Sequence, residues 1–278
     1  MNQKQLSAEP IIEAEGLSVS YGTQTVLDVP SLQVYPNEVL VIIGPNGSGK
    51  TTLLLCLTHL IKPATGTVSY RGVTVANNTA VLKLHRRLAA VFQEPLLLSS
   101  SVWDNVTLGL RLRKVPRGEI KARTEKWLER FGIRALARRQ AKTLSSGEAK
   151  RASLARAFVL QPEVLFLDEP FTALDSPTRQ ALLEDFLSVL RETKVTTVMV
   201  THDRNEALAL ADRVIVLIDG RIKQTGTPED VFGSPIDEEV ASFVEAGNIM
   251  HGVVSSQSGG LALVDVSERH LEVVSDLT

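Results

Sequence analysis

Apolar residues recur along the chain with two different spacings, which predict alternating strands and helices. Residues 11–21 and 26–34 are rich in Val, Ile, Leu and Thr and are separated by Gly22, so each predicts a strand. Residues 39–43 form a continuous apolar run, which is typical of a strand buried on both faces of a parallel sheet. The same reasoning predicts buried strands over 164–167, 196–200 and 214–218, and helices over about 50–60, 177–191 and 205–211.

The middle of the chain, about residues 94–160, has a helical pattern. Pro116 interrupts it, and residues 121–131 and 148–160 have the spacing of amphipathic helices. Because strands alternate with helices elsewhere, the pattern favours an α/β domain with a largely parallel sheet. We therefore interpret the helical middle as an insertion into that domain.

The pattern changes again after Gly247. Short apolar stretches at 253–254, 261–266 and 271–274 predict strands, and two glycines at 259–260 divide them. Only about 30 residues are involved, which is room for about three short strands. Three strands with open edges are marginally stable alone, so the tail is expected to pack on the main domain, to pair with another tail, or to be a vestige.

Composition narrows the class of protein. The chain has 278 residues, of which 44% are hydrophobic, which is enough for a sizeable core and excludes a disordered chain. The single cysteine, Cys56, excludes a disulfide scaffold and fits a reducing compartment. No stretch approaches the ~20 apolar residues of a membrane span, and residues 1–10 lack the apolar core of a signal peptide. We therefore expect a soluble chain that is not exported by that route.

The net charge of −2 conceals an uneven distribution. Residues 111–151 hold 14 Lys and Arg against 4 Asp and Glu, a net charge of +10, whereas residues 225–278 hold 10 acids against Arg269, a net charge of −9. The basic segment could form a nucleic-acid surface. However, its only aromatic side chains of note are Trp127 and Phe131, and acidic residues are interspersed, so a solvated helix face is the better interpretation.

A glycine-rich loop follows the predicted strand over 39–43. Residues 44–51 fit the pattern G-x-x-x-x-G-K-[ST] between a strand and a helix, which is the context that a phosphate-binding loop requires. Lys50 is expected to contact the β- and γ-phosphates and Thr51 to bind Mg²⁺. A chance glycine turn is the alternative, and the strand–loop–helix context disfavours it. The predicted ATP-binding residues are Gly44, Pro45, Asn46, Gly47, Ser48, Gly49, Lys50, Thr51 and Thr52.

Two carboxylates complete this predicted site. Asp168 and Glu169 follow the apolar run 164–167, so a buried strand delivers them to its C-terminal end, where open α/β sheets bind ligands. Asp168 is expected to hold Mg²⁺ and Glu169 to act as the general base toward water. Taken alone, the segment could equally be a strand end with solvated acids.

A third motif connects the chain to a known family. Residues 144–148, Leu-Ser-Ser-Gly-Glu, precede a helix, and with them the chain resembles the ATP-binding cassette (ABC) ATPases over about residues 11–245. The resemblance implies an α/β, P-loop NTPase fold, with a nucleotide-binding domain over 1–245, a helical subdomain inserted at about 94–160, and a short β-rich tail over 246–278.

Further positions match the family in order. Tyr21 stands where the family stacks adenine on an aromatic ring, and Gln93 matches the glutamine that senses Mg²⁺ and the attacking water. Asp175 matches the loop at the dimer interface, and His202 the histidine that contacts the γ-phosphate. Alone, each has a plain alternative: a packed aromatic ring, a polar loop residue or a cap at a strand end. The resemblance thus implies Glu169, His202 and Gln93 as catalytic, and Thr51, Gln93 and Asp168 around Mg²⁺.

The signature departs from the common form at two positions. Ser146 replaces the first of two glycines, and Glu148 stands where glutamine is common. If position 146 needs a positive φ, serine costs about 1 kcal/mol there. Ser145 and Gly147, which carry the phosphate contacts in the family, are intact, so activity is expected.

The resemblance also implies an assembly. Two subunits would form a head-to-tail homodimer around two ATP molecules, with each signature contacting the ATP of its partner. The residues predicted to act in this way are Ser145, Ser146, Gly147 and Glu148. ATP and Mg²⁺ are the implied ligands, and closure of the dimer on ATP would be the motion that hydrolysis reverses.

Three functions remain open for that motion: energising a membrane transporter, acting on nucleic acid or ribosomes, and regulating a partner. One cassette without a fused membrane domain favours an importer whose permease is a separate chain, with an extracytoplasmic binding protein and no nucleic acid. The junction over 241–254 resembles importer ATPases of the molybdate, tungstate, sulfate and polyamine group, in which an oligonucleotide/oligosaccharide-binding-like (OB/TOBE-like) domain follows. We therefore expect a tungstate or molybdate importer ATPase, peripheral on the cytoplasmic face of the membrane.

Overall fold

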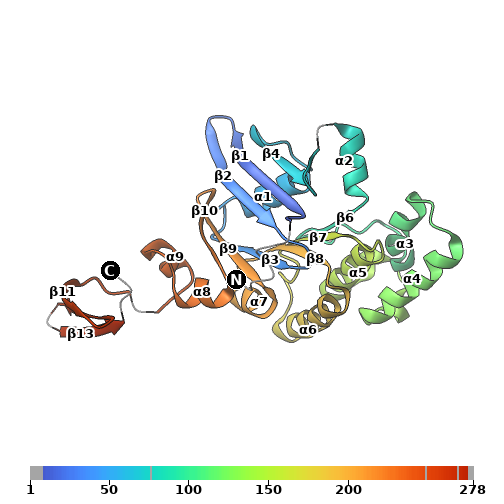
Figure 1. The fold of residues 1–278 in the computed structure, drawn as a ribbon. Helices are drawn as coiled ribbons and strands as arrows, with labels where there is room; N and C mark the ends of the chain where they lie inside the picture. The colour runs from blue at the N-terminus through green and yellow to red at the C-terminus, as the bar shows by residue number, and fades with distance from the viewer. Residues whose placement is uncertain (1–8, 76, 248, 268, 275–278) are drawn as a thin grey trace.

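Three sheets and the helices around them form the part of the chain that the computed structural model describes, residues 9–75, 77–247, 249–267 and 269–274 (Figure 1). Every site residue named above lies in these ranges. Residues 1–8 of the N-terminal segment and Asn248 of the tail junction lie outside them.

A six-stranded sheet occupies the centre, in the order β10-β9-β3-β8-β7-β6. All neighbouring pairs are parallel except β10 and β9, which are antiparallel at one edge. Every residue of β3, β7 and β8 is buried, as their continuous apolar runs predicted. The strands are β3 (Val39–Ile43), β6 (Leu88–Val91), β7 (Val164–Asp168), β8 (Thr196–Val200), β9 (Arg213–Ile218) and β10 (Arg221–Gly226).

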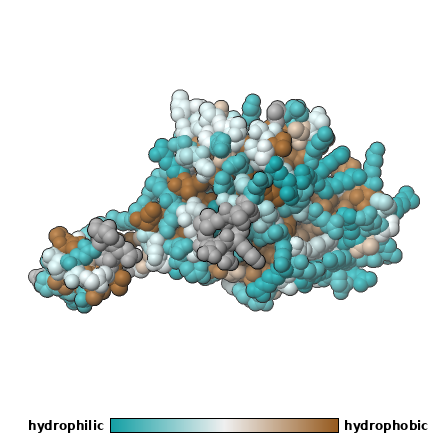
Figure 2. All heavy atoms as spheres, viewed as in Figure 1, coloured by the Kyte–Doolittle hydropathy of each residue, from teal (hydrophilic) through white to brown (hydrophobic). Residues whose placement is uncertain are grey.

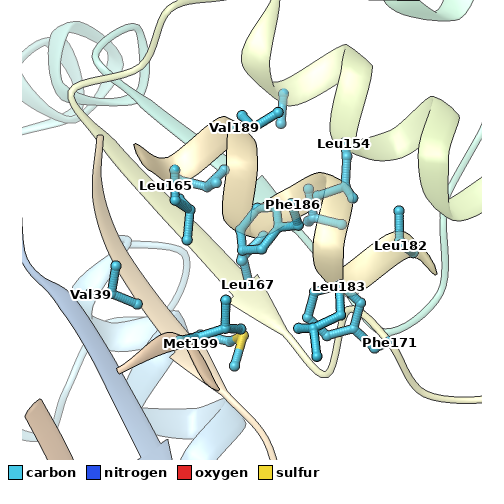
Figure 3. Packing of buried hydrophobic residues seen from close by; sticks show 14 of the residues in the cluster. Val39, Leu154, Leu165, Leu167, Phe171, Leu182, Leu183, Phe186, Val189 and Met199 are labelled. Atoms are coloured by element: carbon cyan, nitrogen blue, oxygen red, sulfur yellow. The ribbon is translucent and has the colours of Figure 1, made fainter. Parts of the chain in front are cut away.

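Alternate residues of this sheet enter two separate cores. Leu40 and Ile42 of β3 pack in one core with helix α1 (Lys50–Leu57), whereas Val41 and Ile43 pack in the other. The second core includes helices α5 (Ser146–Phe158) and α6 (Ser176–Thr193). Figure 3 shows the ring of Phe186, from α6, at the centre of this core. The sheet therefore separates α1 from α5.

A four-stranded antiparallel sheet, in the order β2-β1-β4-β5, lies beside α1. Glu163, directly before β7, joins it to the central sheet, because its carboxylate accepts hydrogen bonds from Tyr70 Oη at 2.6 Å and from the guanidinium groups of Arg71 and Arg87. The strands are β1 (Ile12–Tyr21), β2 (Gln24–Val34), β4 (Thr65–Tyr70) and β5 (Val73–Thr74).

The predicted helical middle contains α3 (Val102–Leu112), α4 (Arg117–Arg130) and α5, with 3₁₀ turns over Arg134–Leu136 and Ala141–Thr143. These helices gather on one side of the molecule (Figure 1). Aromatic rings hold them together: Trp127 of α4 lies 4.9 Å from Phe158 of α5, measured between ring centroids. The amphipathic spacing of residues 121–131 and 148–160 thus corresponds to packed helices.

The tail forms a separate three-stranded antiparallel sheet of β11 (Val253–Ser258), β12 (Leu261–Val266) and β13 (Arg269–Val274). It stands apart from the main domain, beyond α8 (Pro228–Gly233) and α9 (Glu238–Phe243), and it shows apolar side chains on its visible surface (Figures 1 and 2). Ala262 is buried, but Val253 and Val274 are 72% and 83% exposed. Such a small sheet encloses almost no core of its own.

Several elements carry too little apolar periodicity to be predicted. Strands β4 and β10 are polar, with the sequences TGTVSY and RIKQTG, and β6 has only four residues. The other unpredicted elements are β5, α2 (Asn78–His85), α8 and α9, whereas α7 (Arg204–Leu210) was predicted. Within the described ranges, no helix combines the length and apolarity needed to cross a membrane.

The position of Phe186 makes it a sensitive test of this core. Its ring is fully buried and lies 5.7 Å from Phe171 and 6.1 Å from Phe158. We expect Phe186→Ala to lower the free energy of unfolding by about 3–5 kcal/mol in urea titrations, because it leaves a cavity between α6 and the sheet. The exposed Leu112→Ala should change it by under about 0.5 kcal/mol. Equal effects of the two variants would contradict this packing.

Candidate functional site

Three neighbouring strands bring the predicted residues to one edge of the central sheet. The order β3-β8-β7 places the phosphate loop after β3, His202 after β8, and Asp168 and Glu169 at the end of β7. All three strands run parallel, so their C-terminal ends meet at the same edge. This is where open α/β sheets bind ligands.

Backbone geometry requires the glycines of the phosphate loop. A Cβ atom at Gly44 would lie 2.0 Å from the carbonyl oxygen of Leu217, and one at Gly49 would lie 2.8 Å from that of Val26. Gly49 also has φ +96° and Gly47 has φ +81°, which is a backbone region that side chains disfavour. At Gly47 no atom lies within 4 Å of a built Cβ, so this part of the loop faces open space.

Donors in the loop fit a chain of phosphates. Among the described residues, Ser48 Oγ is buried without a hydrogen-bond partner. Lys50 Nζ donates to the carbonyl oxygens of Gly44 at 2.9 Å and Pro45 at 2.7 Å, which holds the ammonium group over the loop. Burial lowers the pKa of Lys50, while the nearby carboxylates of Glu169 and Asp168 oppose that shift. Thr52 continues the first turn of α1, which carries no acidic residue, so the N–H groups there are favourable for an anion.

Oxygen ligands suitable for Mg²⁺ lie beside this loop. Thr51 Oγ1 is 3.1 Å from each carboxylate oxygen of Asp168. Hard oxygen donors of this kind are the ligands that Mg²⁺ prefers, usually together with substrate phosphates. Burial is the largest cause of a raised pKa at Asp168, and a bound cation would favour the ionised carboxylate.

Glu169 is held on both sides of its carboxylate. His202 Nδ1 lies 3.2 Å from Oε1, and Thr172 Oγ1 donates to Oε2 at 3.0 Å. The backbone of Glu169 has φ 44°, which is unusual for a residue with a side chain, and its N–H donates to Val200 O at 2.9 Å. Residues held in this backbone region cluster at functional sites. The geometry suits a positioned base beside the phosphate loop.

Gln93 lies on the exposed loop after β6, and α5 holds that loop. Lys150 Nζ donates to Gln93 O, and Ser153 Oγ donates to Pro95 O at 2.9 Å. Arg156 donates to Leu96 O at 2.7 Å. These three donors recur every third residue and so share one face of α5. This spacing was the sequence signal that could have identified them, and it was not used to predict them.

The signature residues form the N-terminus of α5. Ser145 is the N-cap and Ser146 is the first helical residue, with no positive φ, so the cost considered for serine at position 146 does not arise. A Cβ atom at Gly147 would lie 2.7 Å from Thr178 Cγ2, so a larger residue there would have to displace the Thr178 side chain on α6. Ser145 Oγ accepts from Glu148 N, and Glu148 Oε2 accepts from Ser145 N at 2.7 Å.

The remaining predicted residues lie at the ends of other elements. Asp175 caps α6 by accepting from Thr178 N at 3.0 Å, and this hydrogen bond is the largest cause of its lowered pKa. Tyr21 ends β1 and is 61% exposed. Its hairpin also contains Val26, which packs on the phosphate loop. Asp175 and Tyr21 are therefore available at the surface, and their roles remain predictions.

Sequence reasoning missed a buried acid behind His202. Glu206 is 4% exposed, and its Oε2 accepts from Thr201 Oγ1 at 2.6 Å. Burial raises the pKa of Glu206 to about 6, opposed by the hydrogen bond from Thr201. Asp203, between His202 and α7, pairs with Arg179 of α6 at 3.0 Å. The loop that carries His202 is thus braced by polar contacts at its base.

The pKa of Glu206 gives a pH-dependent contribution to stability. Because the folded value of about 6 exceeds the ordinary 4.5, the folded state keeps a proton that the unfolded chain loses between these pH values. Stability is therefore lost as the pH rises through this window. In urea titrations, we expect the free energy of unfolding of Glu206→Gln, minus that of the unmodified chain, to rise by about 2 kcal/mol between pH 4 and pH 7. The control Glu229→Gln, at an exposed position, should show little such growth; a flat difference for Glu206→Gln would contradict the shift.

Comparison with known protein families and sequences finds relatives over the part of the chain that holds the phosphate loop and the paired carboxylates. Residues 27–172 match the family described as ABC transporter. The chain is 36% identical over 245 residues to a spermidine/putrescine import ATP-binding protein of Acetivibrio thermocellus, covering 88% of this chain and 69% of that protein. It is 41% identical to a sulfate/thiosulfate import ATP-binding protein of Mycobacterium tuberculosis, covering 84% and 66%. Against a 36% identical spermidine/putrescine protein of Bacteroides fragilis, the chain spans about half of the relative's length, 53%.

Solved structures have the same fold. The structure of cbiO1 from Clostridium perfringens, part of an ABC transporter complex, aligns with a TM-score of 0.75 and 30% identity, covering 85% of this chain and 95% of that one. The dimeric structure of MJ0796, a bacterial ABC transporter cassette, aligns with a TM-score of 0.72 and 28% identity over 78% and 98%. The phosphate loop, the paired carboxylates and these likenesses together show that the chain belongs to the ABC transporter family of ATP-binding cassettes.

Proposed function

We propose that this chain is the ATP-hydrolysing subunit of an ABC importer and acts as a homodimer on the cytoplasmic face of the membrane. One observation carries the proposal: the phosphate loop and the paired carboxylates meet at one sheet edge, with Thr51 Oγ1 3.1 Å from the carboxylate of Asp168. This arrangement supports binding of ATP together with Mg²⁺. Family membership supports the same ligands.

In the proposed reaction, a water oxygen attacks the γ-phosphorus, the bond to the bridging oxygen breaks, and ADP leaves. Glu169 accepts the proton of that water, because its carboxylate is held by His202 and Thr172 at the edge where the phosphates would lie. Lys50 and His202 stabilise the charge that develops on the phosphoryl oxygens. Mg²⁺ held by Thr51 and Asp168, with Gln93 as the further ligand that the resemblance implies, would neutralise phosphate charge.

The separation of α1 from α5 supports a site shared between two subunits. These helices pack in different cores on opposite faces of the central sheet. Ser145 Oγ binds the N–H of Glu148, whereas the N–H groups of Ser146 and Gly147 have no partner within the helix, so these two can bind the γ-phosphate of ATP held by a second copy. ATP would then hold two subunits together until hydrolysis. The dimeric cassette among the similar structures supports this assembly.

Import is favoured over action on nucleic acid or ribosomes. The relatives described above are named as import ATP-binding proteins. The basic segment 111–151 also fits a solvated helix face, because half of its cations are paired with acids within 4 Å. These cations are Arg111, Arg123, Lys126, Arg130, Arg134, Arg139 and Arg151. Cations engaged in this way are poorly placed to form a phosphate-binding surface.

The transported solute that we propose is an oxyanion such as tungstate or molybdate. The sequence of the tail junction motivates this choice, and the sulfate/thiosulfate relative supports the class of oxyanions. The polyamine relatives make putrescine the competing solute. The substrate experiment is uptake into vesicles that contain this chain with permease and binding protein from neighbouring genes. Oxyanion uptake driven by ATP would support the proposal, and uptake of putrescine alone would contradict it.

Replacement of the base tests the reaction. We expect Glu169→Gln to bind ATP but to hydrolyse it about 10²–10⁴-fold more slowly, because the amide cannot accept the proton. Dimers should accumulate with ATP and should be visible by light scattering. The control Glu229→Gln changes an exposed carboxylate and should turn over at the normal rate. Near-normal turnover of Glu169→Gln would exclude Glu169 as the base.

Coupling to a partner separates the two candidate functions. With the permease in liposomes, we expect ATP hydrolysis to rise when the loaded binding protein is added. DNA and RNA should leave the hydrolysis rate unchanged, because half of the cations of the basic segment are already paired with acids. Stimulation by nucleic acid without any response to the permease would favour the alternative.

A further inference from the structure

The signature of this chain holds a negative charge close to a predicted phosphate contact. Glu148 is the third residue of α5, and its carboxylate accepts the N–H of Ser145 at 2.7 Å. That hydrogen bond is the largest cause of a lowered pKa, so the carboxylate is ionised at neutral pH. Its negative charge interacts favourably with the helix dipole at the N-terminus of α5. The same charge repels any phosphate that approaches this N-terminus.

Arg139 lies directly against this carboxylate. Its Nη1 is 3.3 Å from Glu148 Oε1 and 3.5 Å from Oε2. The other nitrogens hold the preceding turn: Nε donates to Thr143 Oγ1 at 3.1 Å, and Nη2 donates to Thr143 O at 2.6 Å. One guanidinium group therefore bridges the 3₁₀ turn Ala141–Thr143 and the first turn of α5.

The backbone of Arg139 is fixed as well. Its carbonyl oxygen accepts from Val102 N at 2.9 Å, at the start of α3. The guanidinium thus reaches the signature from an anchored position, which reduces the entropy lost when it forms these bonds. Arg138, the next residue toward the N-terminus, is exposed and lines a shallow pocket near Trp103 instead.

A surface ion pair alone would carry little weight, because the side chains of Arg139 and Glu148 are 44% and 29% exposed. Two features distinguish this pair. Arg139 also donates to the main-chain oxygen of Thr143, in the 3₁₀ turn before the signature. Glu148 accepts from the main-chain N–H of Ser145. Loss of the arginine would therefore leave an uncompensated carboxylate and a released turn at the same place.

We propose that Arg139 is a positioning residue for the signature: it neutralises Glu148 and fixes the turn before Ser145, so that α5 can accept the γ-phosphate of ATP bound by the partner subunit. This role rests on the proposed function, because it requires the shared ATP site. Arg139 does not itself contact the reacting atoms. It compensates in this chain for an acid where the family commonly has glutamine.

The test uses the hydrolysis-deficient Glu169→Gln chain as the parent and measures its ATP-dependent dimerisation by light scattering. We expect Arg139→Gln to raise the ATP concentration for half-maximal dimerisation about tenfold, as for a coupling between neighbouring charges. Arg138→Gln is the matched control, since it removes the same charge one residue away, and it should shift the midpoint by less than about twofold. Thermal unfolding of each variant verifies that it is folded.

Rescue by a second substitution distinguishes charge from structure. Glu148→Gln removes the charge and keeps an oxygen that can accept from Ser145 N. The combination of Arg139→Gln with Glu148→Gln should return the midpoint to within about threefold of the parent, because no carboxylate remains to be neutralised. In the chain with Glu169 intact, Arg139→Gln should raise KM for ATP more than it lowers kcat.

Two results would overturn the role of Arg139 while the parent still dimerises with ATP. One is a midpoint for Arg139→Gln equal to that of Arg138→Gln. The other is a combined variant that keeps the full shift, which would overturn the neutralisation of Glu148 as the basis of that role. Failure of the parent itself to form ATP-dependent dimers would instead overturn the proposed function, and this role with it.

Discussion

The site depends on one constraint: three adjacent parallel strands must end together. In the order β3-β8-β7, the strands deliver Lys50 and Thr51, then His202, then Asp168 with Glu169. Each strand is buried along its whole length, so sheet pairing and apolar packing fix where it ends. Polar groups that no single segment could bring together thereby meet at one edge. The geometry of the candidate site is thus a consequence of burial of Val, Ile, Leu and Phe side chains on both faces of the sheet.

A second set of contacts joins this edge to the helices. The donors of Lys150, Ser153 and Arg156 hold the carbonyl oxygens of Gln93, Pro95 and Leu96 in the loop after β6. The same helix, α5, begins at the signature. A displacement of the Gln93 loop would therefore move the surface offered to a partner subunit. Leu96 and Glu169 both have a left-handed backbone, and hydrogen bonds hold each of them: Arg156 donates to Leu96 O, and Glu169 N donates to Val200 O.

Acidic and basic side chains are paired locally between elements, which the net charge of the chain does not reveal. Much of the excess positive charge in the helices is matched by acids on neighbouring helices, such as Glu192 and Asp185 of α6. Glu163 is surrounded by Tyr70, Arg71 and Arg87 and joins two sheets. The ion pair of Glu148 with Arg139 likewise joins the signature to the turn that precedes it. In each case an acid placed between elements orients them, and its cost of desolvation is offset by hydrogen bonds.

The sequence by itself determined the α/β class, the phosphate loop, the paired carboxylates and the family, because each depends on a local pattern of residues. Glycines at fixed spacing and an apolar run that ends in acids require no knowledge of distant contacts. Only the tertiary structure decided that Ser146 has no positive φ, that Gly147 packs against Thr178, that Lys150 bonds the loop of Gln93 and that Arg139 bonds the carbonyl oxygen of Thr143. Polar strands such as β10 also escaped prediction, since their position comes from pairing with β9. The physical reason is common to all of them: these features arise from contacts between segments far apart in the chain or between neighbouring turns, and no local periodicity encodes such contacts.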